Sequence, residues 1–163
     1  LLARSADDAA AFERRWRGVA AADRIQPRIA AAAARNATAL GKAALARDIL
    51  ENALAAEWVT QLVLLYGGLP ERLDPEERIS EARARIERAE QWLLERERDS
   101  HLLATLGRLC AQAELWGKAR SFLEASLSFE ESRAARIELA RLAERLGQSD
   151  EAQRHFRRAA EAT

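Results

Sequence analysis

The sequence predicts an all-α fold, a solenoid of about nine antiparallel helices. Three observations support this prediction. The 163 residues include only 7 Gly and 3 Pro, so few positions interrupt a helix. Ala, Leu, Arg and Glu, which are strong helix formers, dominate the composition. One pattern of small and large apolar residues occurs three times, which is typical of stacked helical repeats.

The repeated pattern places small and apolar residues at relative positions 0, 1, 4, 8, 13, 17 and 20. The copy nearest the C-terminus consists of Leu139, Ala140, Ala143, Gly147, Ala152, Phe156 and Ala159. A copy 106 residues earlier consists of Ala33, Ala34, Ala37, Gly41, Ala46, Leu50 and Ala53. A third, 33 residues before the C-terminal copy, consists of Leu106, Gly107, Cys110, Ala119, Leu123 and Ser126.

This spacing closely resembles the tetratricopeptide repeat (TPR), a helix–turn–helix unit of about 34 residues. The resemblance implies a right-handed superhelical solenoid. Small residues let the two antiparallel helices of a unit approach closely, and a Gly in the turn accepts a positive φ that ends the first helix. Each unit leaves one face uncovered, so we expect the units to stack.

The elements follow in order along one predicted TPR domain, 1–163. Residues 1–25 form a leading or capping segment, in which Ser5–Trp16 is an isolated second helix. The three copies of the pattern define the regular units. These are repeat 1 at 26–56, repeat 3 at 99–130 and repeat 4 at 131–163.

An irregular repeat 2 is predicted at 57–98. Its first helix covers Glu57–Tyr66 and ends at the Gly-Gly-Leu-Pro segment. Its second helix runs from Pro75 to about Glu95 and carries an apolar stripe at intervals of three or four residues. Asp74 is the predicted N-cap, with Pro at the first helical position.

Composition excludes several classes of function. Twenty-six basic and 26 acidic residues cancel, which argues against nucleic acid as a partner. One Cys excludes a disulfide within the chain and a Cys-rich metal site. The longest apolar run, Trp58–Tyr66, is too short to span a bilayer. Because the chain starts at Leu1 and contains no Met, we expect it to be a fragment of a longer protein.

A more specific signal lies in the second half of the chain. Residues 89–93 are AEQWL, residues 102–110 are LLATLGRLC, and residues 115–127 are LWGKARSFLEASL. This succession resembles the C-terminal repeat region of the proteobacterial HemY family. The segment Phe12–Trp16 is also similar to the opening of that region. One departure is the loop at 95–100, which replaces the His-Pro or Asp-Pro loop usual in the family.

The resemblance implies a function and a location. HemY-family proteins are inner-membrane proteins associated with haem and porphyrin biosynthesis, with membrane helices that precede the repeats. It therefore implies a non-catalytic protein-interaction scaffold whose partners are haem-pathway enzymes. It also implies a soluble fragment of a membrane-anchored parent, with the repeats on the cytoplasmic side. A TPR module of cytochrome c maturation is the alternative family, disfavoured by the Trp-Gly-Lys motif at 116–118.

The best candidate binding residues are three arginines. Arg35, Arg108 and Arg141 occupy one position in the three copies, two residues beyond the leading apolar residue, where the side chain faces the concave groove of a TPR array. Guanidinium groups there would clamp the carboxylates of an acidic peptide or of haem propionates. The alternative is that they form salt bridges with Glu residues of the groove. The predicted flanking residues are His101, Arg28 and Arg145.

No catalytic or metal-binding arrangement is visible in the sequence. Cys110 occupies a small-residue packing position, so a buried thiol is favoured over a haem ligand. His101 and His155 are expected at the surface, and the four Trp are expected to pack between repeats rather than to form an aromatic binding site. No cofactor is predicted, although direct binding and carriage of haem or porphyrin in the groove is the alternative function. Self-association through the helix that contains 159–162, giving a homodimer, is a third hypothesis.

Overall fold

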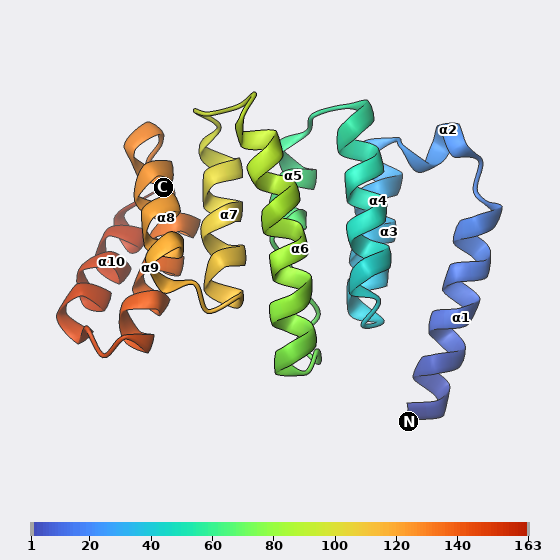
Figure 1. Cartoon of the computed structure of the whole chain (residues 1–163), viewed down its shortest axis with the longest axis horizontal. Coiled ribbons are helices and arrows are strands. Elements are labelled where there is room, and N and C mark those ends of the chain that lie inside the picture. The colour runs from blue at the N-terminus through green and yellow to red at the C-terminus, as the bar shows by residue number, and fades with distance from the viewer. Residues whose placement is uncertain (1, 163) are drawn as a thin grey trace. The chain divides into compact units, whose positions relative to one another are not determined.

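The structure is a computed structural model that describes residues 2–162, with side chains from residue 6 onward. Ten helices and no strand occur in this range, which confirms the predicted all-α class (Figure 1). Within the same residues, no helix is both long and apolar enough to cross a membrane. The chain divides into two compact units, Leu1–Glu81 and Ala82–Thr163.

The first unit contains five complete helices and the start of a sixth. They are α1 (Leu2–Gly18), α2 (Ala21–Arg24), α3 (Pro27–Ala39), α4 (Ala43–Ala56), α5 (Thr60–Tyr66) and the N-terminal part of α6 (Pro75–Leu93). The four-residue helix α2 is absent from the sequence prediction. The Arg24 side chain holds the segment before it, because its Nε donates to the carbonyl of Val19 at 2.7 Å.

Alanine determines how α3 and α4 pack. On α3, Ala30 and Ala37 have no exposed surface, and the same is true of Ala46 and Ala53 on α4. A methyl group on each side lets the two antiparallel backbones come close, and Ala37, Ala46 and Ala53 stand at small positions of the repeat pattern. The short helix α5 packs against both members of this pair.

The start of α6 follows its predicted cap. The Oδ1 atom of Asp74 accepts hydrogen bonds from the backbone N–H groups of Glu76 at 3.0 Å and of Glu77 at 3.1 Å. Pro75 takes the first helical position, where a missing N–H costs nothing. Asp74 is therefore the N-cap, as predicted.

The second unit holds the rest of α6 and two regular helix pairs. They are α7 (Ser100–Gln112) with α8 (Trp116–Phe129), and α9 (Arg133–Arg145) with α10 (Ser149–Glu161). The two pairs stack because α9 also contacts both α7 and α8. Leu123 of α8 forms a buried cluster with Ala135 and Leu139 of α9. This cluster is the inter-repeat contact that the pattern predicts.

The turn inside each regular pair repeats one geometry. Gly41, Glu114 and Gly147 occupy the same position of the pattern, and their φ values are 75°, 61° and 73°. In each turn the N–H of the next residue donates a hydrogen bond to a carbonyl of the preceding helix. Lys42, for example, donates to the carbonyl of Ala37 at 2.8 Å. This is the Schellman motif, which prefers Gly at the left-handed position. Two copies carry the predicted Gly, and the third uses Glu.

Gly107 lies where α7 and α8 are in close contact. A Cβ atom at this position would lie 2.5 Å from Cγ of Leu123 and 3.2 Å from the carbonyl oxygen of Ala119. Such distances are far inside van der Waals contact, so only Gly fits here without movement of its neighbours. The small residue that the pattern places at this position is therefore required by packing in this pair.

Candidate functional site

Two of the three candidate arginines meet at one carboxylate. Arg108 on α7 and Arg141 on α9 both reach Oε1 of Glu138, with nitrogen–oxygen distances of 4.0 Å and 3.2 Å. Glu138 precedes Arg141 by one helical turn, and α9 packs against α7, so the three side chains share one surface. The salt-bridge alternative therefore describes the arrangement of these two arginines.

The shared carboxylate leaves much of both guanidinium groups available. The side chain of Arg108 is 47% exposed and that of Arg141 is 64% exposed, whereas Glu138 is 21% exposed. A guanidinium carries five N–H donors, and one carboxylate satisfies few of the ten. The group Arg108–Glu138–Arg141 is accordingly a positively charged surface with donors left for a second carboxylate.

The first unit has its own pair of arginines in the same register. Arg28 and Arg35 lie seven residues apart on α3, which is two helical turns, and both are exposed. His101 and Arg108 have the same seven-residue spacing on α7. The register that the sequence identified is thus present in both units, each taken by itself.

The other two predicted flanking residues make local contacts. His101 is half-buried in the first turn of α7, with its Nε2 3.9 Å from Oε2 of Glu130. The guanidinium of Arg145 lies over the ring of Trp116, 5.5 Å from the centroid, in a cation–π contact. Arg145 thereby connects α9 to α8.

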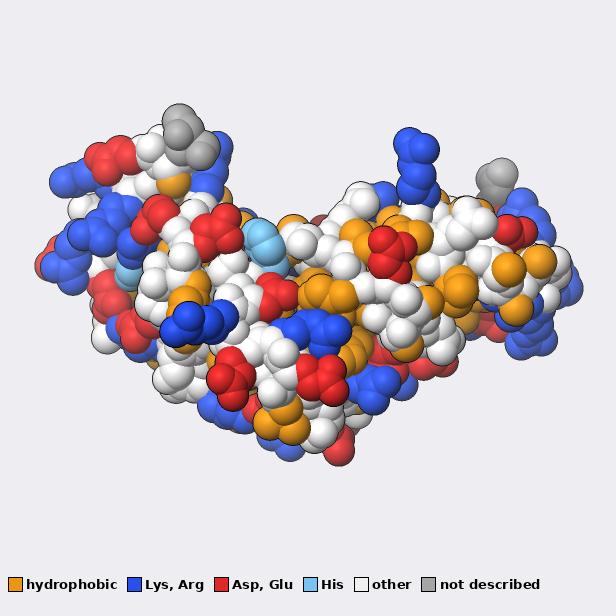
Figure 2. All heavy atoms as spheres, turned by 90° about the horizontal axis from the view of Figure 1, so that it is seen from above, with side chains coloured by type: hydrophobic (Ala, Val, Ile, Leu, Met, Phe, Trp, Pro, Cys, Tyr) orange, Lys and Arg blue, Asp and Glu red, His pale blue; other side chains and the backbone are white. Residues whose placement is uncertain are grey.

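Stacked arginines also cover two other tryptophan rings. The guanidinium of Arg24 lies 5.9 Å from the ring centroid of Trp16, and that of Arg88 lies 5.7 Å from that of Trp92. Each of these contacts is between residues close in sequence, so neither contact connects two repeats. On the face shown in Figure 2, basic, acidic and apolar side chains are interleaved.

Cys110 is buried, as the sequence predicts. Burial raises the pKa of its thiol to about 11, and the nearby charges of Lys118 and Glu90 act in opposite directions on it. A haem or metal ligand needs the thiolate, which this environment disfavours. Among the described residues, no group of three or more His, Cys, Asp or Glu side chains is arranged to hold a metal ion.

His155 lies between charged neighbours rather than at a free surface. Burial lowers its pKa, and the charge of Arg136, whose Nη1 lies 3.4 Å from Nδ1, adds to this effect. Glu151, 3.8 Å from Nε2, acts in the opposite direction. Glu151 itself accepts a 2.6 Å hydrogen bond from Arg120 of α8, which lowers its pKa. The network joins α8, α9 and α10, so His155 takes part in the contact between the two helix pairs.

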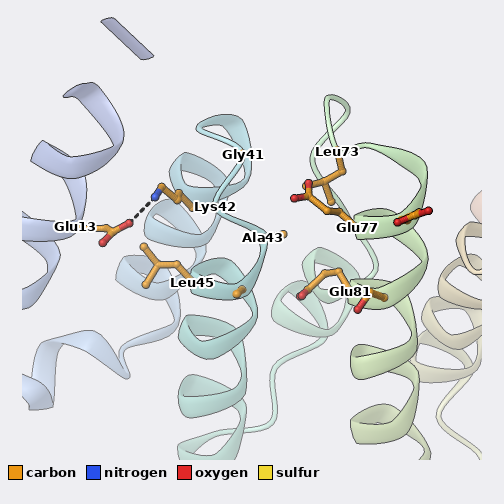
Figure 3. A pocket seen from close by; sticks show the side chains of 11 residues that line it. Glu13, Gly41, Lys42, Ala43, Leu45, Leu73, Glu77 and Glu81 are labelled. Atoms are coloured by element: carbon orange, nitrogen blue, oxygen red, sulfur yellow. Dashed lines mark ion pairs between the residues drawn. The ribbon is translucent and has the colours of Figure 1, made fainter. Parts of the chain in front are cut away.

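The first unit contains an acidic hollow that the sequence reasoning missed (Figure 3). Its volume is about 700 Å³, and it lies between α1, the turn from α3 to α4, and the start of α6. The residues that line it are Glu13, Gly41, Lys42, Ala43, Ala44, Leu45, Leu73, Glu76, Glu77, Ser80 and Glu81. Four carboxylates and one ammonium group give the lining a net negative charge.

Two of these carboxylates form ion pairs with basic side chains, and a third lies close to another acidic side chain. The ammonium of Lys42 lies 2.9 Å from Glu13 and lowers its pKa, and Arg47 donates to Glu81 at 3.1 Å. The charge of Asp74, together with a hydrogen bond to it, raises the pKa of Glu77. The sequence signal here is the Asp-Pro-Glu-Glu run at 74–77, which predicts a helix start rather than a hollow.

Comparisons with known proteins add evidence for the fold. No protein-family model and no curated protein matches the chain significantly. Among solved structures, the chain is similar to MamA, a helical repeat protein of the TPR type, with a TM-score of 0.55. The match covers 94% of this chain and 85% of that one at 16% sequence identity. At this identity the similarity shows the fold alone, and it confirms the predicted TPR-like class.

Proposed function

We propose that the chain is a non-catalytic scaffold that binds a protein partner through the first helices of its repeats. The TPR-like fold supports this role, because stacked helix pairs present a preformed surface and avoid much of the ordering cost of binding. The observation that carries the proposal is the exposed group Arg108–Glu138–Arg141, in which two guanidiniums share one carboxylate.

The chemistry of this surface favours a partner with an acidic segment. A carboxylate from the partner would replace water on the free N–H donors and form bidentate, charge-assisted hydrogen bonds. Arg35 offers the same chemistry in the same register of the first unit. These contacts would orient the partner and speed its association, while apolar contacts of the first helices would supply affinity.

The finer proposal concerns haem biosynthesis. The segments at 89–93, 102–110 and 115–127 resemble the HemY family, so the proposed partners are enzymes of the porphyrin pathway at the inner membrane. The proposal for the parent protein includes a membrane anchor outside this chain. A TPR module of cytochrome c maturation remains the alternative assignment.

Affinity capture from detergent-solubilised native membranes tests the proposal. Three baits are compared: the native chain, the triple variant R35E/R108E/R141E, and the control R15E/R72E/R83E. The control makes the same charge change at exposed arginines outside the first helices. We expect the native and control baits to enrich a porphyrin-pathway enzyme about tenfold more than the triple variant.

The other outcomes test the two parts of the proposal separately, namely the arginine site and the association with haem biosynthesis. Equal capture by all three baits would move the site away from the arginines. Capture of no pathway enzyme by any bait would overturn the association with haem biosynthesis. Direct carriage of haem predicts saturable one-to-one binding in a Soret absorbance titration of the purified chain, whereas a scaffold predicts none.

A further inference from the structure

We infer that one end of the first unit is a surface that docks on an anionic lipid bilayer. This basic end consists of the last turn of α1, the short helix α2 and the first turn of α3, which lie together in Figure 1. Its arginines on α1 and α2 lie outside the first-helix surface of the proposed function. The contact is also independent of the anchor proposed for the parent protein.

Charge is segregated within this unit, although the whole protein is neutral. Residues 14–47 contain eight basic residues and one acidic residue, whereas residues 48–81 contain two basic and eight acidic residues. Four of the basic residues lie at the basic end: Arg15, Arg17, Arg24 and Arg28. The acidic first turn of α6 lies at the opposite end of the helices. A negatively charged surface therefore attracts the basic end of the unit and repels the other end.

Two acidic residues also lie at the basic end. Asp23 belongs to α2 and accepts a 3.0 Å hydrogen bond from Gln26, and Glu57 follows the last turn of α4. The four arginines outnumber them, so the basic end keeps an excess of positive charge. Arginine binds phosphate oxygens through bidentate, charge-assisted hydrogen bonds, and phosphate is the charged group of anionic phospholipids.

Arg24 gives the basic end its shape. Its Nε donates to the carbonyl of Val19 at 2.7 Å, its Nη2 donates to the carbonyl of Arg17 at 2.6 Å, and its guanidinium lies over Trp16. These contacts hold the last turn of α1 against α2. Arg17 lies 3.6 Å from Glu13 but its side chain is 78% exposed, so most of its donors face water.

An exposed apolar side chain stands beside the arginines. Ile25 connects α2 to α3, follows Arg24 directly, and is 40% exposed. A bilayer surface offers headgroup phosphates to the arginines and an apolar layer to Ile25. A polyanion in solution offers partners to the arginines alone. The combination of charge and exposed apolar surface therefore favours a bilayer.

The geometry of stacking keeps the basic end accessible. Helical repeats pack side by side along a solenoid, so the helix ends and loops form its edges. A further helix pair beside α1 would cover the side of α1 and leave this edge open. The small number of charges predicts a weak, salt-sensitive contact, which orients the unit on a membrane rather than holding the protein there by itself.

Co-sedimentation of the purified full chain with lipid vesicles tests the inference. The vesicles are phosphatidylcholine alone, or equal parts of phosphatidylcholine and phosphatidylglycerol, at low and at physiological salt. We expect the native chain to bind only the anionic vesicles, with affinity about tenfold weaker at the higher salt.

Three variants separate the basic end from the charge of the whole chain. R15E/R17E should weaken binding to anionic vesicles at least about tenfold, and Ile25→Ser about threefold. The matched control R72E/R83E makes the same change of net charge at exposed arginines outside the basic end, and it should bind as the native chain does. Circular dichroism checks that each variant keeps its helix content.

An environment-sensitive fluorophore locates the contact. Ala22 is exposed on α2, and Ser80 is exposed near the start of α6 at the opposite end. Cys110 is buried, so the label is directed to the introduced cysteine. We expect the emission of labelled A22C to shift to the blue on anionic vesicles, and the emission of labelled S80C to stay unchanged.

Several results would overturn the inference. They are no binding to anionic vesicles, equal losses in R15E/R17E and R72E/R83E, or equal emission shifts at positions 22 and 80. Binding of poly-glutamate that R15E/R17E abolishes, without binding to vesicles, would assign the basic end to an acidic protein instead. The capture experiment above contains detergent and no bilayer, so the proposed function and this inference fail independently of each other.

Discussion

The pairs α7–α8 and α9–α10 have the same register, but they use it differently. In α7–α8 the large residue of the second helix, Leu123, is buried by the next pair, and Gly107 lets the two helices come into close contact. In α9–α10 the equivalent residues are Phe156, which is partly exposed, and Ala140. The repeat position therefore sets the direction in which a side chain points. Whether a neighbouring element covers that side chain sets how much its burial stabilises the fold.

The largest expected effect tests that statement directly. Leu123→Ala removes a fully buried side chain between two pairs and should lower the free energy of unfolding by about 3 kcal/mol. Phe156→Ala, at the same repeat position, should cost about 1 kcal/mol, since much of the ring remains in water. Urea unfolding of dilute protein measures both. Equal losses would mean that register alone fixes the energetic role.

The next effect concerns the close approach inside α7–α8. Gly107→Ala should destabilise the chain by about 2 kcal/mol, because the added methyl meets Leu123, although Ala is the better helix former. In a Leu123→Ala background the clash with Leu123 is removed and only the 3.2 Å approach to the carbonyl oxygen of Ala119 remains, so the same change should cost much less. A double-mutant cycle measured by urea unfolding gives the coupling. Additive losses would contradict this account of the packing.

A smaller effect distinguishes the two turns. Glu114→Gly should stabilise the chain by about 1 kcal/mol, because φ of 61° strains a residue with a Cβ. Gly147→Ala should cost about the same amount at the equivalent position of α9–α10. Thermal unfolding of the two variants checks the opposite signs. If Glu114→Gly lowers the melting temperature, the Glu114 side chain contributes more than the strain costs.

The smallest expected effect is the pH dependence of the network that joins the two pairs. The pKa of His155 is lowered from 6.5 in the folded chain, so the unfolded chain binds a proton first as pH falls. Stability is therefore retained above pH 6.5 and is lost as pH falls through the folded pKa. The free energy of unfolding of the His155→Asn variant should therefore vary less between pH 7.5 and 5.5 than that of the native chain.

The pH range keeps the two carboxylates nearest to this network out of the measurement. The carboxylates of Glu131 and Glu151 have pKa values lowered from 4.5 by their arginine partners, so they remain charged throughout. Denaturant titrations at each pH measure the difference between the two chains. Identical pH profiles would show that His155 titrates alike in the folded and unfolded states.

The sequence predicted much of the fold because the decisive signals are local. The paired small residues of α3 and α4, the capping of α6 by Asp74, and the positive φ of Gly41 and Gly147 all depend on neighbours along the chain. It missed α2, which is too short to produce a periodic pattern. Glu114 stands at the Gly position of the third copy, and only the structure shows that it takes the left-handed conformation there without a Gly.

The candidate site was less predictable. The sequence identified Arg108 and Arg141 as equivalent, but only the packing of α9 against α7 brings both to Glu138. The acidic hollow combines residues of α1, α4 and α6 that lie far apart in the chain, so no local sequence pattern predicts it. Contacts between charged side chains that are distant in sequence do not change the spacing of the apolar residues, so a periodic pattern does not reveal them.

The longer helices, the turns of the regular pairs and the direction in which each apolar residue points therefore follow from the sequence alone, because backbone hydrogen bonds and side-chain size act locally. Only the tertiary structure shows which of these apolar side chains a neighbouring element covers. The same register buries Leu123 and leaves Phe156 partly in water, since only the first has a helix pair packed against it. The energy of burial depends on that neighbour, which no single repeat encodes.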